Sequence, residues 1–152
     1  MQVKTILAAG ILGLSASWAQ AETKADQAIE YRQGVYRAME WNLTRMAAMA
    51  QGRTDFDAAE FVERSDRLRL LGEIVGEGFA DAKSSRGETV ETRASYRIWD
   101  ARDRFDEMMA EMHTRTRELQ QAAVAGQDKD ELRPLVGRVA QSCKACHDKF
   151  RD

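Results

Sequence analysis

Apolar residues at seven-residue spacing constrain the fold of this chain more than any other feature of its sequence. Between residues 91 and 125 there are two such series, namely Ile98, Phe105, Met112 and Leu119, and, interrupted at Arg115, Ala101, Met108 and Ala122. A seven-residue period places side chains along one face of an α-helix that packs against other helices. The segment of about Glu91–Ala125 is therefore predicted as one long amphipathic helix, which ends at Gly126.

Two earlier segments carry the same kind of pattern. The first, of about Lys24–Gln51, ends before Gly52, a suitable residue to stop a helix. Its core face consists of Ile29, Tyr36, Met39, Leu43, Met46 and Ala50. The second begins near Asp55 or Asp57, because either carboxylate can cap a helix N-terminus. Its apolar face consists of Phe61, Leu68, Leu71, Val75 and Phe79.

A fourth helix is predicted over about Asp130–Phe150. Pro134, the single proline of the chain, is tolerated only in or near the first turn of such a helix. The longest connection is predicted at Ala80–Thr89, where lysine, serine and glycine cluster. Four amphipathic helices with mostly short connections favour an all-α fold, an antiparallel four-helix bundle.

The most specific motif is Cys-Lys-Ala-Cys-His at residues 143–147, which contains both cysteines of the chain. This pattern is the attachment site of a c-type haem. Cys143 and Cys146 lie one turn apart on one helix face, so both thiols can bond the same haem. His147 stays on that face and can reach the iron as its proximal ligand. The alternatives are a redox Cys-x-x-Cys pair, a structural disulfide that would close a very small loop, and a chance match.

Residues 1–21 have the features of a secretory signal peptide. Lys4 supplies a positive start, Thr5–Leu14 is apolar and uncharged, and residues 19–21 form the small-x-small cleavage site Ala-Gln-Ala. The apolar run is shorter than the ~20 residues that span a bilayer; an uncleaved membrane anchor is the alternative. We expect a mature chain of residues 22–152, without a membrane segment, in the periplasm of a Gram-negative bacterium.

The charge of the chain argues against nucleic acid as a partner. Cleavage would remove one of the 23 basic residues, Lys4, and none of the 25 acidic ones, so the net charge would change from −2 to −3. No basic stripe with interleaved aromatic residues occurs in the sequence. The mature chain is long enough for one domain with a real core.

Three blocks of the sequence resemble the cytochrome c′ family, the class II c-type cytochromes. They are residues 31–43, Tyr-Arg-Gln-Gly-Val-Tyr-Arg-Ala-Met-Glu-Trp-Asn-Leu, residues 92–99, Thr-Arg-Ala-Ser-Tyr-Arg-Ile-Trp, and residues 142–151, Ser-Cys-Lys-Ala-Cys-His-Asp-Lys-Phe-Arg. The haem motif near the C-terminus is the most specific of these, since small c-type cytochromes usually carry it near the N-terminus. The resemblance implies one covalently attached haem c inside a four-helix bundle, a fold of which cytochrome c′ is itself a standard example.

The resemblance also implies further cofactor-binding residues. Arg32 and Gln33 match the family's pair beside the haem propionates, where a guanidinium would form charge-assisted bonds; a solvated helix face is the alternative for Arg32. Glu91 and Thr92 match a segment that approaches the haem rim. Arg151 matches an arginine beside the proximal face, and an ordinary cation near a helix C-terminus is its alternative.

Tyr36 matches the residue that covers the distal face of the iron. A methionine stands there in the low-spin branch of the family and becomes the sixth ligand, so tyrosine implies a five-coordinate, high-spin iron. Packing alone is the alternative for Tyr36. Met39, one turn away, is more typical of a core residue than of a ligand. His113 follows the apolar Met112 and is expected at the surface.

Three functions from different classes are compatible with these residues. The favoured one is a periplasmic haem protein that binds nitric oxide and carbon monoxide, not an enzyme. The second is a low-spin class II cytochrome that exchanges electrons with redox partner proteins. A peroxidase is third, because it needs a distal acid–base group. Trp41 and Trp99 are expected in packing or subunit contacts, and a homodimer through the first two helices is left open.

Overall fold

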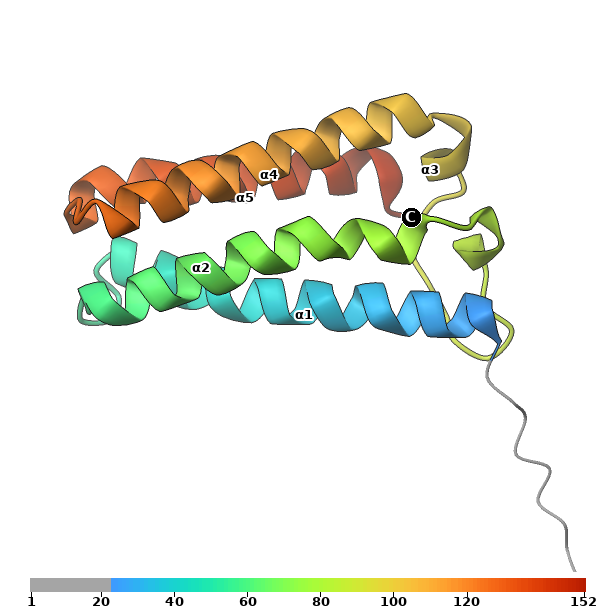
Figure 1. Cartoon of the computed structure of the whole chain (residues 1–152), viewed down its shortest axis with the longest axis horizontal. Coiled ribbons are helices and arrows are strands. Elements are labelled where there is room, and N and C mark those ends of the chain that lie inside the picture. Colours follow the sequence, from blue (N-terminus) through green and yellow to red (C-terminus); the bar gives the residue numbers. More distant parts are fainter. Residues whose placement is uncertain (1–22) are drawn as a thin grey trace, which may run out of the picture.

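The computed structural model describes residues 23–152, and within them four long helices lie side by side as a bundle (Figure 1). They are α1 (Lys24–Ala50), α2 (Ala58–Ile74), α4 (Arg102–Val124) and α5 (Lys129–Phe150). The shorter elements are the 3₁₀ helices η1 (Val75–Phe79) and η2 (Ala82–Ser85) and the single turn α3 (Arg97–Asp100). The predicted all-α four-helix bundle is confirmed. The predicted signal peptide lies outside the described residues.

One end of the bundle is closed by short turns, residues 51–57 and 125–128, which we call the turn end. Each turn contains a glycine at positive φ, Gly52 at 69° and Gly126 at 78°, a conformation that costs glycine nothing. Asp57, one of the two predicted caps, accepts from the backbone N–H of Glu60 at 3.0 Å. Asp128 forms a full capping box at the start of α5. The sequence therefore places these helix ends correctly.

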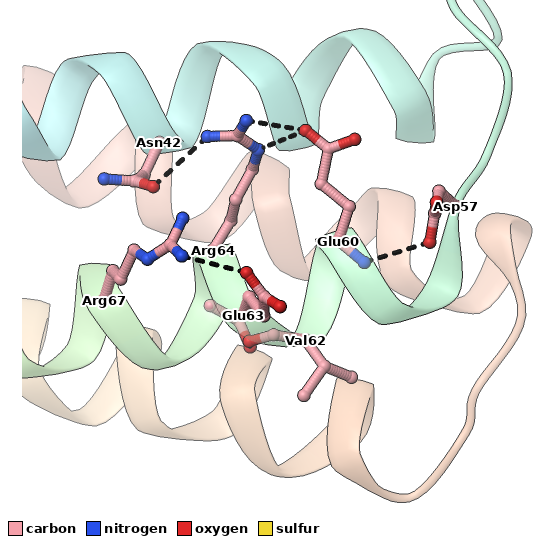
Figure 2. A network of polar contacts seen from close by, with 8 residues as sticks. Asn42, Asp57, Glu60, Val62, Glu63, Arg64 and Arg67 are labelled. Atoms are coloured by element: carbon pink, nitrogen blue, oxygen red, sulfur yellow. Dashed lines mark hydrogen bonds and ion pairs between the residues drawn. The ribbon is translucent and has the colours of Figure 1, made fainter.

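Two ion pairs, each one helical turn apart, lie along α2 (Figure 2). Arg64 bonds Glu60 at 2.6 Å and Arg67 bonds Glu63 at 2.8 Å. Arg64 also reaches the side-chain oxygen of Asn42 on α1, at 3.4 Å. An exposed pair such as Arg67–Glu63 contributes only about 0.3–0.5 kcal/mol, so it adds little to the stability of the bundle.

The opposite end of the bundle is an irregular segment, residues 75–101, which we call the loop end (Figure 1). The predicted start of the third helix at Glu91 is wrong. Residues 91–95 are not helical; the N–H of Ser95 donates to the carbonyl of Phe150 at 2.9 Å, and Ala94 forms an isolated bridge with Arg151. Ala101, at φ −117° and ψ 47°, then separates α3 from α4. Pairing with the end of α5 thus replaces the first turns of the predicted helix.

A buried carboxylate fastens the loop end to the first turn of α1. Asp26 is 0% exposed, and its side chain accepts hydrogen bonds from the backbone N–H groups of Glu88, Thr89 and Val90 at 3.0–3.2 Å. Burial alone would raise its pKa, but the bonds from Thr89, Val90 and the Thr23 hydroxyl outweigh burial and lower the pKa to about 2. The loop predicted at Ala80–Thr89 is therefore held by a charge, although it contains few apolar anchors.

The core follows the predicted heptads. Ile98, Phe105, Met112 and Leu119 are each at most 5% exposed. On α1, Ile29, Met39, Met46 and Ala50 are buried, whereas Tyr36 and Leu43 are half-buried. Pro134 is the sixth residue of α5, close to the first turn of the helix, and it is exposed. No helix in the described part of the chain is long and apolar enough to cross a membrane.

Candidate functional site

A cavity of about 600 Å³ opens between α1, α4 and α5 next to the loop end. The residues of the haem motif, Cys143, Cys146 and His147, line it from α5. The other predicted site residues that line it are Arg32, Gln33, Tyr36, Thr92 and Arg151. Glu91 does not line it; its backbone carbonyl instead accepts a hydrogen bond from the Gln33 amide at 2.8 Å. The fold thus brings residues from three distant parts of the sequence to one cavity.

Both thiols are free and half-buried. Burial raises the pKa of the Cys143 thiol, and burial together with the neighbouring Cys143 raises that of Cys146. A redox-active cysteine pair needs the opposite shift, because the thiolate is the nucleophile. The raised pKa values of both thiols therefore disfavour the redox interpretation of the motif.

The surroundings of His147 favour the neutral form of its imidazole ring. Burial lowers its pKa, as do Arg151 and Arg93, against the opposite effects of Asp148 and Glu40. A neutral imidazole nitrogen is the form that binds a metal. Arg151 is thus close enough to influence the imidazole, and the backbone N–H of Arg151 donates to the backbone carbonyl of His147 at 3.0 Å.

Tyr36 approaches His147 from α1. The two ring centroids are 6.3 Å apart and the rings are inclined at 75°. Burial, followed by the two cysteines, raises the pKa of the Tyr36 phenol, so it stays protonated. Met39 lines the same cavity one turn further along α1. Both side chains considered for the distal side are therefore present at the cavity, and the aromatic ring is the one that contacts His147.

Arg32 is not a solvated residue, and that alternative is wrong. It is 2% exposed, and its guanidinium donates four hydrogen bonds of 2.8–2.9 Å. The acceptors are all neutral oxygens, namely the carbonyls of Gly78 and Ser84 and the hydroxyls of Ser84 and Thr92. Burial lowers its pKa to about 10, so it remains charged at neutral pH. None of the four hydrogen-bond acceptors of Arg32 is negatively charged, so the guanidinium has no counter-ion among them.

The charges around the cavity suit an anionic group. Its lining includes Arg32, Arg37, Arg93 and Arg151 but a single carboxylate, Glu40. The two propionates of a haem carry the opposite charge, and its ring would meet the apolar side chains of the lining. The donor set of two thiols, one imidazole and several guanidinium groups therefore fits a covalently attached haem.

Sequence reasoning missed several residues of the cavity. Phe79, Met108 and Met109 line it, and Phe79 packs against Arg32, whose guanidinium lies 4.8 Å from the ring centroid. Phe79 and Met108 lie on predicted apolar helix faces, so the sequence predicted their burial but not their contact with the cavity. His113 was expected at the surface; it is half-buried, and its Nε2 lies 2.8 Å from the carbonyl of Gly72 on α2.

Comparison with known proteins places these features in a family context. The sequence profile described as Cytochrome C' matches residues 27–151. The chain is 36% identical to a cytochrome c′ of Halomonas halodenitrificans over 127 residues, which cover 83% of this chain and 96% of the relative.

Two solved structures are similar as well. A nitric oxide complex of a cytochrome c′ variant from Alcaligenes xylosoxidans has a TM-score of 0.76 and 30% identity, and the match covers 86% of this chain and 97% of that one. A carbon monoxide complex of another variant of the same protein has a TM-score of 0.76 and 30% identity, with 86% and 98% coverage.

Proposed function

The chain belongs to the cytochrome c′ family, whose members carry covalently bound haem, and from this premise we propose that it is an exported, periplasmic protein that binds nitric oxide and carbon monoxide at a five-coordinate haem. The observation that carries the proposal is the contact between Tyr36 and His147, whose ring centroids lie 6.3 Å apart. A phenol is a poor sixth ligand when its pKa is raised by burial. A small neutral gas would then bind only after a side-chain movement.

In this proposal each cavity residue has a distinct role. Cys143 and Cys146 attach the haem through thioether bonds, and His147 ligates the iron. Arg32 and Gln33 flank the propionates, with the Thr92 hydroxyl beside them; all three line the cavity. Bound haem supplies the iron that takes the gas, while the protein holds the cofactor, keeps the imidazole neutral and restricts access to the distal side.

Mass spectrometry and absorption spectra test the proposal directly. The denatured, exported protein should have the mass of the polypeptide plus one haem, and Cys143→Ser with Cys146→Ser should remove the covalent haem. The reduced protein should have a high-spin spectrum that changes when carbon monoxide is added. A polypeptide mass without haem, from cells that attach haem to other c-type cytochromes, would contradict it.

Gas access is tested by Tyr36→Ala. Removing the ring should speed carbon monoxide association and, because a half-buried aromatic packed against Phe79 and His147 is lost, lower stability by up to about 3 kcal/mol. Tyr31→Ala is the matched control, since Tyr31 is 37% exposed and bonds Ile74 and Glu77 away from the cavity. Equal association rates in wild type and Tyr36→Ala, measured by stopped flow, would mean that Tyr36 does not limit entry.

A low-spin electron carrier is the second candidate. The observation in its favour is Met39, which lines the cavity on the same helix as Tyr36. A methionine–iron charge-transfer band in the spectrum, lost in Met39→Leu, would support this candidate over gas binding. A dedicated peroxidase is less well supported, since His113 bonds Gly72 and does not line the cavity.

We also propose that the protein forms a homodimer through α1 and α2. Two large apolar side chains on α2 are exposed, Leu70 at 51% and Ile74 at 40%. Sedimentation velocity on wild type and Leu70→Glu would test it, and a monomeric wild type at high concentration would contradict it.

A further inference from the structure

Aromatic rings form a continuous series from the proposed haem site to the surface of the loop end. The ring of Tyr36 lies 6.3 Å from His147 and 6.3 Å from Phe79, measured between centroids. Phe79 lies 6.3 Å from Trp99, and Trp99 lies 6.2 Å from Tyr96. All these separations are within the range of direct aromatic contact. Tyr96, the last member, is 53% exposed.

We propose that this series conducts electrons from Tyr96 to the haem site when hydrogen peroxide is reduced there, so that the oxidising equivalent leaves the cavity and reaches the surface. The inference rests on the proposed function, because it requires haem beside Tyr36 and His147. It adds a role for Trp99 and Tyr96, which have no part in gas binding.

The chemistry of the members sets the direction of transfer. Tyrosine and tryptophan are the aromatic side chains most readily oxidised by one electron, whereas phenylalanine resists oxidation. The Arg32 guanidinium, 4.8 Å from the centre of Phe79, disfavours positive charge on that ring further. Phe79 therefore acts as a bridge across which the electron passes, and Trp99 is the first stable donor beyond Tyr36.

Tyr96 is a suitable end point because its phenol can lose a proton to water. Trp99 is half-buried, and its indole N–H donates to the carbonyl of Phe79 at 3.2 Å, which is not a base. An electron therefore passes from Tyr96 to the oxidised Trp99, and the Tyr96 radical is stabilised when its phenol loses a proton. Two such Tyr96 radicals from two molecules then join through a new carbon–carbon bond.

The overall step is balanced. Two phenols each give up one electron and one proton, one peroxide O–O bond breaks, and two waters form. The product is a covalent dimer of the chain, joined through dityrosine at residue 96. Packing alone could explain the rings, but it would not make dimer formation through Tyr96 depend on Trp99.

The chain contains a control tyrosine and a control tryptophan for Tyr96 and Trp99. Tyr31 is 37% exposed and lies outside it, with its hydroxyl bonded to Ile74 and Glu77. Trp41 is 58% exposed and stacks on the guanidinium of Arg45, 3.3 Å from the ring centroid. Changing either of these to phenylalanine removes an oxidisable ring without interrupting the series.

The experiment treats the haem-loaded ferric protein with hydrogen peroxide and measures the covalent dimer by denaturing electrophoresis, dityrosine fluorescence and peptide mapping. Wild type, Tyr31→Phe and Trp41→Phe should form the dimer through residue 96. Tyr96→Phe should not form it, and Trp99→Phe should lose most of it. Dimers linked mainly through Tyr31, or equal yields from Trp99→Phe and wild type, would overturn the inference.

Carbon monoxide difference spectra of the same samples separate this inference from the proposed function. Variants that bind carbon monoxide like wild type retain the haem site, so a missing residue-96 dimer in a gas-binding wild type overturns only the electron-transfer series. Absence of both covalent haem and the carbon monoxide spectrum in wild type overturns the two together.

Discussion

The two ends of the bundle are held by different kinds of bond. At the turn end, caps join groups that are two or three residues apart. At the loop end, Arg32 and Asp26 join α1 to residues 46 to 64 positions away in the sequence. The turn end is held mainly by these exposed local caps, with one long-range bond from the Arg133 side chain to the Ala50 carbonyl at 2.7 Å, whereas the loop end depends on two buried charges.

This difference matters because the loop end forms one wall of the cavity. Arg32, Phe79 and Thr92 line the cavity, while no residue of the turns 51–57 and 125–128 does. Burying a charge is costly unless its hydrogen bonds are satisfied. The end that holds the site is therefore also the end where substitutions are least tolerated, and the following variants test that conclusion.

Replacing the buried guanidinium should have the largest effect. Arg32→Met leaves the carbonyls of Gly78 and Ser84 without their donors in a buried site, and we expect a loss of about 3–5 kcal/mol in unfolding free energy. Arg67→Met on the exposed face of α2 is the control, with an expected change of about 0.5 kcal/mol or less. Urea unfolding of the haem-loaded variants measures both changes. Similar losses of unfolding free energy in Arg32→Met and Arg67→Met would contradict the conclusion that the buried cation matters more than the exposed one.

A methyl group at residue 87 should be the next most disruptive change. A Cβ at Gly87 would lie 2.2 Å from the carbonyl oxygen of Val90 and 2.4 Å from a carboxylate oxygen of Asp26. Gly87→Ala should therefore cost about 1–3 kcal/mol. At Gly137, inside α5, a Cβ meets nothing within 4 Å, so Gly137→Ala should stabilise by about 0.5–1 kcal/mol. Thermal unfolding of the two variants should thus shift in opposite directions.

The Asp26 carboxylate predicts a dependence on pH. Its folded-state pKa of about 2 is below the ordinary 3.8, so its contribution is complete above pH 3.8 and is lost as the pH falls towards 2. Asp26→Asn should be less stable than wild type at pH 7, and the difference should narrow below about pH 4. Asp57→Asn, which keeps a cap at the turn end, should track wild type. A difference that stays constant down to pH 2 would contradict this assignment.

The smallest effect is expected from a cap at the turn end. Asp128→Ala removes the acceptor for the N–H groups of Asp130 and Glu131 and should cost about 1 kcal/mol. Carbon monoxide binding should not change, because the cap is remote from the cavity lining. A shifted carbon monoxide spectrum in this variant would mean that the two ends are coupled.

Much of the bundle could be predicted from local sequence. Heptad spacing located most of the buried face of α1, α2 and α4, and Gly52, Gly126 and Asp57 located the turn end. The haem motif identified the face of α5 that lines the cavity. These features depend on residues close together in the sequence, which is why pattern and capping chemistry sufficed.

The loop end could not be predicted in the same way. Residues 91–95 pair with the end of α5, and nothing near Glu91 in the sequence signals a partner at Phe150. The resemblance to cytochrome c′ predicted Arg32 beside the haem but not its hydrogen-bond acceptors, which come from η1, η2 and Thr92. Only the tertiary structure brings those oxygens together around a guanidinium.

The long separations of these contacts also imply an order of folding. Closing a long chain segment costs entropy before any contact is gained, so such contacts form late. The hairpin of α4 and α5 needs only the turn at 125–128 and should form first. The contacts of Arg32 and Asp26 would then close the cavity wall last. Cys143 and Cys146 would therefore stay accessible on a formed helix during haem attachment, before the wall covers them.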